Sequence, residues 1–410
     1  MSLIRPFAAL RPRPDRAQEV VAPPYDVLSS EEARLAAADR PLSFLHISKA
    51  EIDLPPGTDV YSDAVYAQAR KNFDRMRDNG VLCRDAAPYY YLYQLRLGDR
   101  EQNGLVALGS VAAYEEQRIR RHELTRPDKE DDRVRQIDAL DAQTGPVFLT
   151  YRARPSVSSI LAAIRREPPE TEVTLDGVRH RIWPIRDAAV IEALTAEFDA
   201  AGVLYIADGH HRSAAAARVA HLRGRGQADH QDAPYGYFLS VLFPDSEVRI
   251  LDYNRVLRDL NGHSPETFRA RLADVFTVRP SFIPVKPRRK GEFGLYLDHQ
   301  WYRLRIRPER LRNDPVQSLD VTLLDQHVLG PVLAITDPRR DKRIDFVGGI
   351  RGLSALERRV DQGEMVVAFS VFPTALDDLM KVADAGQIMP PKSTWFEPKL
   401  ADGLVSHLLC

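Results

Sequence analysis

The fold of this chain is decided by the stretch Val203-Leu-Tyr-Ile-Ala-Asp-Gly-His-His-Arg-Ser213, which runs directly into the alanine-rich segment 214–222. The apolar residues before Asp208 are typical of a buried strand, and the alanines favour a helix. Residues 208–212 must therefore form the turn between a strand and a helix N-terminus.

This junction predicts an anion-binding site. The first N–H groups of a helix have no intrahelical partner, and the helix dipole leaves partial positive charge there. Gly209 permits the turn, Arg212 can bind phosphate, and His210 and His211 can donate hydrogen bonds or carry a proton. A simpler interpretation is that Asp208 caps the helix and the other side chains lie in solvent. Five consecutive residues with functional chemistry favour the site.

A length of 410 residues allows two or three domains. We expect an N-terminal α+β region over 1–150, the phosphate-loop region over 151–262, and a C-terminal α+β region over 263–410 that packs into the same site. The alternation of strands and helices around residue 203 indicates an α/β fold, mixed with α+β parts.

Composition excludes several classes of partner. Lys plus Arg number 57 and Asp plus Glu 58, so a net charge of −1 gives no general attraction to nucleic acid or anionic membranes. The N-terminus lacks an apolar leader, and no apolar run approaches the ~20 residues of a membrane span. Two cysteines, Cys83 and Cys410, indicate reduced thiols. We expect a cytoplasmic protein that acts on small molecules, with its oligomeric state left open.

A second charged segment covers residues 118–133. Mixed-charge runs usually form solvated helices, but Pro127 interrupts this one and places the preceding residues in a loop or at a helix start. Such a loop could supply a general base, a metal-holding carboxylate and phosphate-binding cations. His122, Glu123 and Arg126 are its candidate site residues.

Two proline-rich segments add weaker candidates. Ala22-Pro-Pro-Tyr-Asp26 is extended chain, in which Tyr25 and Asp26 either line a site or belong to a rigid connector. Gly386-Gln-Ile-Met-Pro-Pro-Lys-Ser-Thr394 looks like a phosphate-binding P-loop, but its prolines remove the N–H groups that would hold phosphate. Lys392, Ser393 and Thr394 remain candidates as side-chain phosphate ligands, the alternative being a loop that closes the domain.

Other elements follow from periodicity and turn signals. The pattern predicts the following elements: a strand over 42–47, a helix from Tyr61 to Met76, paired strands over 89–95 and 105–111, a hairpin at Asp176-Gly177 and a polar loop over 223–234.

Metal binding has no local signature. The chain lacks Cys-x-x-Cys and His-Glu-x-x-His, and the adjacent His210 and His211 cannot readily point at one ion. The sequence therefore does not favour zinc. A metal, if one binds, is expected to be Mg²⁺ held by carboxylates and a substrate phosphate, with protein ligands that the sequence does not identify.

Six ordered motifs carry a resemblance that spans nearly the whole chain. They are Arg5-Pro-Phe, Ala22-Pro-Pro-Tyr-Asp-Val27, Arg121-His-Glu-Leu-Thr-Arg126 with Lys129-Glu130, Tyr205-Ile-Ala-Asp-Gly-His-His-Arg212, Asp252-Tyr-Asn-Arg255 and Met389-Pro-Pro-Lys-Ser-Thr-Trp-Phe-Glu-Pro-Lys399. The chain resembles the bacterial and archaeal domain-of-unknown-function 1015 family. Its Asp-Gly-His-His-Arg loop in turn resembles the phosphate loop of the ParB/sulfiredoxin superfamily, which includes ParB proteins, sulfiredoxin and free-serine kinases.

The second resemblance implies roles for the loop. Gly209, His210, His211 and Arg212 would hold the donor phosphates, and Asp208 would assist the reacting hydroxyl. The other catalytic glutamate of the serine kinases lies outside the motif and is not carried over. Sulfiredoxin has a cysteine where this chain has His210, which argues against reduction of a sulfinic acid.

The sequence thus favours a small-molecule kinase with free L-serine as the leading acceptor, giving O-phosphoserine. ATP, ADP or pyrophosphate would be the donor. Asp208 or Glu123 would orient the acceptor proton, His210 would shuttle it, Arg126 and Lys392 would neutralise phosphate charge, and His122, Tyr25 and Asp26 would contact the substrate. The alternatives are a phosphoester hydrolase and a ParB-like nucleotide switch or DNA-associated regulator. Against the last, loop and strands are predicted after Leu222 instead of a helix-turn-helix.

Overall fold

The computed structural model describes residues 2–225 and 232–410. It divides into two compact units, Met1–Val248 with Pro398–Cys410, and Arg249–Glu397. This division differs from the three expected regions. Strands from 1–150 and from 151–248 hydrogen-bond within one sheet, and the last residues of the chain also belong to that unit.

The first unit is built on a mixed sheet of nine described strands in the order β6-β11-β8-β12-β5-β4-β10-β9, with β1 paired to β5. β11 runs parallel to β6 and antiparallel to β8, whereas β8 and β12 are parallel. The expected mixed α/β fold is confirmed. The strands are β1 (Ile4–Arg5), β4 (Tyr90–Leu97), β5 (Arg100–Ser110), β6 (Ile119–Arg120), β8 (Val147–Tyr151), β9 (Thr171–Leu175), β10 (Val178–Ile185), β11 (Leu204–Asp208) and β12 (Tyr237–Pro244).

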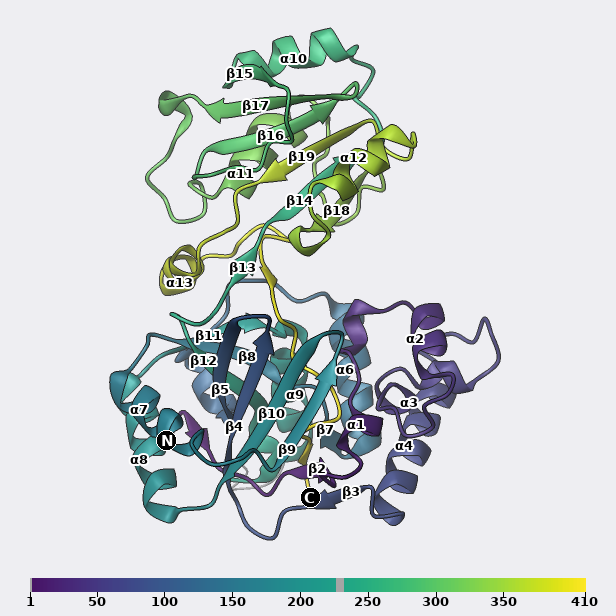
Figure 1. Ribbon diagram of the computed structural model, residues 1–410, viewed down its shortest axis with the longest axis vertical. Helices are drawn as coiled ribbons and strands as arrows, with labels where there is room; N and C mark the ends of the chain where they lie inside the picture. Colours follow the sequence, from purple (N-terminus) through teal and green to yellow (C-terminus); the bar gives the residue numbers. More distant parts are fainter. Residues whose placement is uncertain (1, 226–231) are drawn as a thin grey trace. The chain divides into compact units, whose positions relative to one another are not determined.

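Helices cover this sheet, with α4 packed on α6, α6 on α9, and α7 on α8 (Figure 1). The helices are α1 (Ala17–Val20), α2 (Ser30–Ala37), α3 (Leu45–Ser48), α4 (Asp63–Asp78), α5 (Val111–Glu115), α6 (Pro127–Leu140), α7 (Pro155–Ile164), α8 (Ala188–Ala201) and α9 (His210–Gly224), with short 3-10 turns at Tyr25–Val27, Ala50–Asp53 and Pro234–Gly236. Two short ladders, β2 (Leu10–Pro12) with β3 (Leu82–Arg84) and β7 (Ala142–Gln143) with β21 (His407–Leu408), pair segments distant in the sequence.

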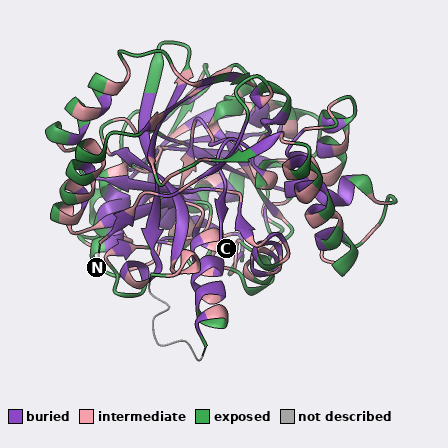
Figure 2. Ribbon diagram, turned by 90° about the horizontal axis from the view of Figure 1, so that it is seen from below, coloured by how far each residue is buried: buried purple, intermediate pink, exposed green. Residues whose placement is uncertain are grey.

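The core explains the composition of α9. The central strands are buried, whereas the helices carry exposed outer faces (Figure 2). Ala216, Ala217 and Ala220 of α9 belong to the same buried cluster as Leu149 of β8 and Ile206 of β11. Small side chains let a helix approach a sheet closely, so the alanine run holds the N-terminus of α9 at the end of β11.

The second unit has its own antiparallel sheet in the order β15-β17-β16-β19-β14-β18. Its elements are β13 (Ile250–Leu251), β14 (Tyr253–Leu257), α10 (Pro265–Ala273), β15 (Phe276–Ser281), β16 (Glu292–Leu297), β17 (Gln300–Ile306), α11 (Asp320–Leu324), a π-helical turn at Asp325–Leu329, β18 (Ile344–Gly348), α12 (Ser354–Asp361), β19 (Val367–Val371), α13 (Leu376–Asp384) and β20 (Trp395–Phe396), with 3-10 turns at Pro308–Arg310 and Gly349–Arg351.

Most local predictions agree with these elements. The predicted helix from Tyr61 is α4, β4 pairs with β5, and the hairpin at Asp176-Gly177 joins β9 to β10. The strand predicted over 42–47 is wrong, because residues 45–48 form α3; a short buried apolar run fits either structure. Residues 226–231 of the predicted polar loop lie outside the described residues. Among the described helices, none combines the length and apolar character of a membrane span.

Candidate functional site

The strand, loop and helix predicted around residue 208 are present in the first unit. β11 ends at Asp208, Gly209 has a φ of 95°, and α9 begins at His210. The positive φ favours glycine, and a Cβ at position 209 would lie close to Cα of Val147, at 3.3 Å. No side chain of the described residues caps α9, and Asp208 instead accepts a 2.8 Å hydrogen bond from the Gly209 N–H. The simpler interpretation of Asp208 as a helix cap is wrong.

Asp208 is paired with a lysine that the sequence analysis did not select. Nζ of Lys399 lies 2.9 Å from Oδ2 of Asp208. Burial alone would raise the pKa of Asp208, but Lys399 and Arg212 outweigh that effect and hold the pKa below its usual value. Asp208 is therefore an ionised carboxylate at the N-terminus of α9. Lys399 ends the motif that begins at Met389, but no local pattern linked it to Asp208.

The loop between β6 and α6 lies against the phosphate loop. The backbone N–H of His122 donates to Nε2 of His210 at 3.4 Å, and the N–H of Arg126 donates to Nε2 of His211 at 3.0 Å. The rings of His122 and His210 meet edge to face, with centroids 4.5 Å apart. The structure thus brings both predicted segments together. The guanidinium of Arg126, however, is exposed and pairs with Asp128 at 2.7 Å.

Burial shifts the pKa values of the three histidines downward, which favours their neutral forms. Burial lowers the pKa of His122 to about 4, although the Ile206 carbonyl and Asp208 oppose the shift. Burial, reinforced by His122, lowers the pKa of His210, and burial also lowers that of His211. Neither ring nitrogen of His122 has a hydrogen-bond partner with normal geometry among the described residues.

One set of donors could hold a metal ion. His122, Glu123 and His210 each offer a ligand atom, and these atoms lie within 4.8 Å of one another. Within residues 2–225 and 232–410 this is the one group of three or more His, Cys, Asp or Glu side chains so arranged. Two imidazoles do not fit the expected Mg²⁺ site, because Mg²⁺ prefers oxygen ligands. The search for local motifs missed this group because His210 lies far along the chain from the other two residues.

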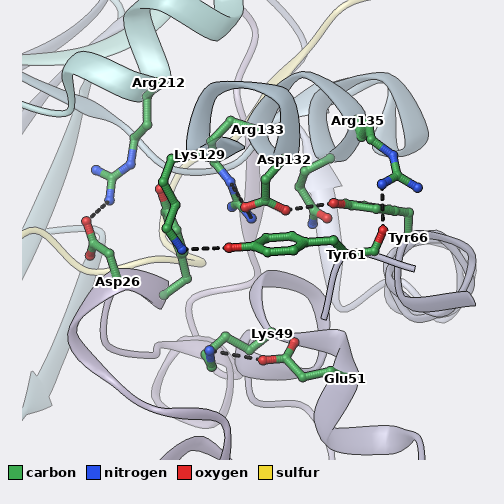
Figure 3. A network of polar contacts seen from close by, with 12 residues as sticks. Asp26, Lys49, Glu51, Tyr61, Tyr66, Lys129, Asp132, Arg133, Arg135 and Arg212 are labelled. Carbon is green, nitrogen blue, oxygen red and sulfur yellow. Dashed lines mark hydrogen bonds and ion pairs between the residues drawn. The ribbon is translucent and has the colours of Figure 1, made fainter. Parts of the chain in front are cut away.

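Arg212 is held by contacts with two distant segments. It donates from Nη1 to the Pro146 carbonyl at 2.8 Å. From Nη2 it donates to Asp26 at 3.3 Å (Figure 3). Its Nε has no partner in the described part of the chain. The guanidinium carbons of Arg133 and Arg212 lie 3.9 and 5.3 Å from the centroid of the Tyr25 ring. Tyr25 and Asp26 therefore do lie beside the loop.

A cavity opens next to Arg212. Its lining includes Tyr25, Arg133, Gln143 and Asp402. Asp402 is 2% exposed, accepts a 3.3 Å hydrogen bond from the Tyr25 N–H at Oδ2, and has no partner at Oδ1 among the described residues. Burial raises the pKa of Asp402 to about 7. Sequence reasoning missed Asp402 because a single aspartate between Ala401 and Gly403 carries no recognisable pattern.

The remaining candidates belong to the second unit. Lys392 is exposed, with Nζ 5.6 Å from the centroid of the Tyr253 ring. Ser393 is buried and donates to the Pro390 carbonyl at 2.5 Å, whereas Thr394 is half-buried. Participation of these three residues in a site with Arg212 stays a prediction.

Comparison with solved structures finds distant likenesses. A free serine kinase in complex with AMP is 13% identical, with 71% of this chain and 86% of that chain covered and a TM-score of 0.35. A conserved hypothetical protein from Pyrococcus furiosus is 16% identical, with coverages of 74% and 95% and a TM-score of 0.35. SbnI from Staphylococcus aureus, truncated at its C-terminus, is 12% identical, with coverages of 73% and 86% and a TM-score of 0.38. We draw no function from TM-scores this low.

Comparison with curated proteins finds no match. A family model, in contrast, matches residues 4–322, more than half of the chain. The match includes both loops of the site and ends before the Met389–Lys399 motif. The chain therefore belongs to the family described as "Protein of unknown function (DUF1015)".

Proposed function

We propose that the protein is a small-molecule kinase that transfers a phosphoryl group from a nucleotide or pyrophosphate to a hydroxyl group. The observation that carries the proposal is the carboxylate of Asp208, held ionised by Lys399 beside the uncapped N-terminus of α9. Phosphoryl transfer depends on positioning and on neutralising charge, and these groups supply an acceptor for the hydroxyl proton next to an anion site.

The donor phosphates would bind at the start of α9. The N–H groups of His210 and His211 belong to its first turn, where the helix dipole favours negative charge. Nε of Arg212 has no partner in the described part of the chain, and the contact of Arg212 with Asp26 is long enough, at 3.3 Å, to be exchanged for a phosphate oxygen. ATP, ADP and pyrophosphate all present such oxygens. Mg²⁺ would arrive on the donor phosphates, since the histidine-rich donor set does not suit it.

The cavity next to Arg212 is lined by groups that could pair with the charged ends of a hydroxylated amino acid. Asp402 is a buried carboxyl with an oxygen that has no partner among the described residues and could bind an ammonium group, and Arg133 and Arg212 offer positive charge for a carboxylate. With free L-serine as acceptor, the hydroxyl oxygen would attack the terminal phosphorus, its proton would pass to Asp208, and the bond from phosphorus to the leaving phosphate oxygen would break. O-phosphoserine and the shortened donor would be the products.

A transfer screen tests the proposal. Purified protein is incubated with ATP, ADP or pyrophosphate and with L-serine, L-threonine or L-homoserine, and the phosphorylated product is measured by mass spectrometry. We expect one donor and acceptor pair to react, Asp208→Asn to lower the rate by about 100- to 10,000-fold, and Arg212→Ala to abolish transfer. Lys71→Met, an exposed change on α4, is the matched control.

The same screen separates the alternatives. Release of phosphate at equal rates with and without an acceptor would indicate a phosphoester hydrolase. Nucleotide binding without any turnover would indicate a ParB-like switch. If no donor binds, or if Arg212→Ala transfers phosphate as fast as the parent protein, the kinase proposal is wrong.

A further inference from the structure

We propose that His122, Glu123 and His210 bind one divalent transition-metal ion. The three residues come from two segments, the loop before α6 and the first turn of α9, that the fold brings into contact. The inference stands on this donor set and does not require the proposed kinase activity.

The strongest observation is the buried imidazole of His122. Its side chain is 1% exposed, and apart from an interaction with the Ile206 carbonyl neither ring nitrogen has a hydrogen-bond partner of normal geometry among the described residues. A buried polar atom without a partner costs about 1–3 kcal/mol, so native proteins rarely leave one unsatisfied. A metal ion would use a lone pair of this ring.

The other two donors converge on the same place. Glu123 and His210 each place a ligand atom near one of His122, and the three atoms lie within 4.8 Å of one another. In a tetrahedral site with bonds of about 2.1 Å, ligand atoms lie about 3.4 Å apart. Small side-chain rotations would close that difference. The hydrogen bond from the His122 N–H to Nε2 of His210 is long, at 3.4 Å, and would be given up at little cost.

The ligand types define the class of metal. Two neutral imidazoles and one carboxylate suit Zn²⁺, Co²⁺, Mn²⁺ or Fe²⁺, whereas Mg²⁺ selects oxygen atoms and keeps its waters. Three protein ligands leave at least one coordination position for water or a substrate oxygen, as in catalytic metal sites. Both histidines interact electrostatically with Asp208, so the ion would lie beside the carboxylate of the candidate site.

Direct metal binding to the full-length protein tests the inference. The protein is stripped with a chelator and titrated with Zn²⁺, Co²⁺, Mn²⁺ and Mg²⁺ by calorimetry, and the Co²⁺ form is examined by absorption spectroscopy. We expect one equivalent of Zn²⁺ and of Co²⁺ to bind, with ligand-field bands for Co²⁺, and millimolar Mg²⁺ not to compete. X-ray absorption of the Zn²⁺ form should show two imidazole ligands.

Substitutions assign the ligands. Glu123→Gln and His122→Gln should each weaken Zn²⁺ binding by about 100-fold or more. His211→Gln, next to a proposed ligand, and His221→Gln, exposed near the end of α9, should bind Zn²⁺ like the parent protein. Circular dichroism checks that each variant is folded, and the absorption data on the unaltered protein do not depend on any variant.

Several outcomes would overturn the inference. They are failure of Zn²⁺ and Co²⁺ to bind, Mg²⁺ binding as tight as Zn²⁺, fewer than two imidazoles around Zn²⁺, or unchanged affinity in folded Glu123→Gln and His122→Gln proteins. None of these readouts measures phosphoryl transfer, so the inference and the kinase proposal can fail separately.

Discussion

Nζ of Lys399 lies 2.9 Å from the carboxylate of Asp208, although 191 residues separate them in the sequence. The pair belongs to one compact unit, because the last residues of the chain belong to the unit that contains β11. Lys399 and Arg212 keep the half-buried Asp208 ionised, and that charge state is what a group receiving a hydroxyl proton needs.

Replacement of Lys399 should therefore move the pH dependence of the proposed transfer. In Lys399→Met, the pKa of Asp208 rises because an opposite charge is lost, so the acid limb of kcat/KM shifts to higher pH. Rates measured from pH 4 to 9 in parallel with Lys71→Met would show the shift. If the acid limb lies at the same pH in both proteins, Lys399 does not influence the ionisation that limits the rate.

Gly209→Ala should destabilise the first unit more than a matched change elsewhere. Alanine at a positive φ costs about 1–2 kcal/mol, and the contact with Val147 should add about 1 kcal/mol or more. Gly177→Ala in the β9–β10 turn is the control, since its φ is also positive at 78° but a Cβ there meets no atom within 4 Å. Native-state hydrogen exchange in β5 gives both free energies of unfolding. If Gly209→Ala and Gly177→Ala lower the free energy of unfolding equally, the contact with Val147 relaxes without cost.

The sequence predicts the centre of this site because its signals are local. Apolar residues up to Ala207, a glycine, and a run of alanines specify strand, turn and helix within twenty residues. Pro127 likewise marks the start of α6 and leaves His122 and Glu123 in a loop. The wrong prediction of a strand over 42–47 also has a local cause. Most residues of this short run are buried, so the run lacks the periodicity that separates a helix from a strand.

The rest of the site depends on contacts between distant segments. His210 faces His122 instead of its neighbour His211, and Asp402 borders the cavity beside Arg212. One sequence contains no signal for such pairings, because each of these residues taken alone is an ordinary polar residue. Arg126 illustrates the opposite error. Arginine is a residue type that binds phosphate, but the side chain of Arg126 pairs with Asp128.

Lys392 provides a test of whether the second unit contributes to the site. If its exposed ammonium contacts a donor phosphate, Lys392→Met should raise the KM for the donor by about tenfold, because a charge-assisted contact is lost. Lys286→Met, another exposed lysine of the second unit, is the matched control. Steady-state kinetics at a saturating concentration of the acceptor measures both. A KM equal to that of the control would remove Lys392 from the donor site.

Asp402→Asn should change how the stability of the first unit depends on pH. Asp402 has its pKa raised by burial from 3.8 to about 7 in the folded protein. Below pH 4 the carboxyl is protonated in both folded and unfolded states. Between pH 4 and 7 the unfolded chain loses this proton while the folded protein keeps it, so stability falls by up to about 1.4 kcal/mol per pH unit and then levels off.

Asparagine has no proton to lose and can still accept the hydrogen bond from the Tyr25 N–H. The free energy of unfolding of Asp402→Asn, minus that of the parent protein, should therefore grow from pH 4 to 7 and stay constant above pH 7. Hydrogen exchange in β4 and β8 reports the first unit alone. Other titrating groups, such as the buried Asp320 of the second unit, occur in both proteins and cancel in the difference. Parallel stability profiles across this range would show that Asp402 is already ionised in the folded protein, with Arg212 and Arg133 compensating its burial.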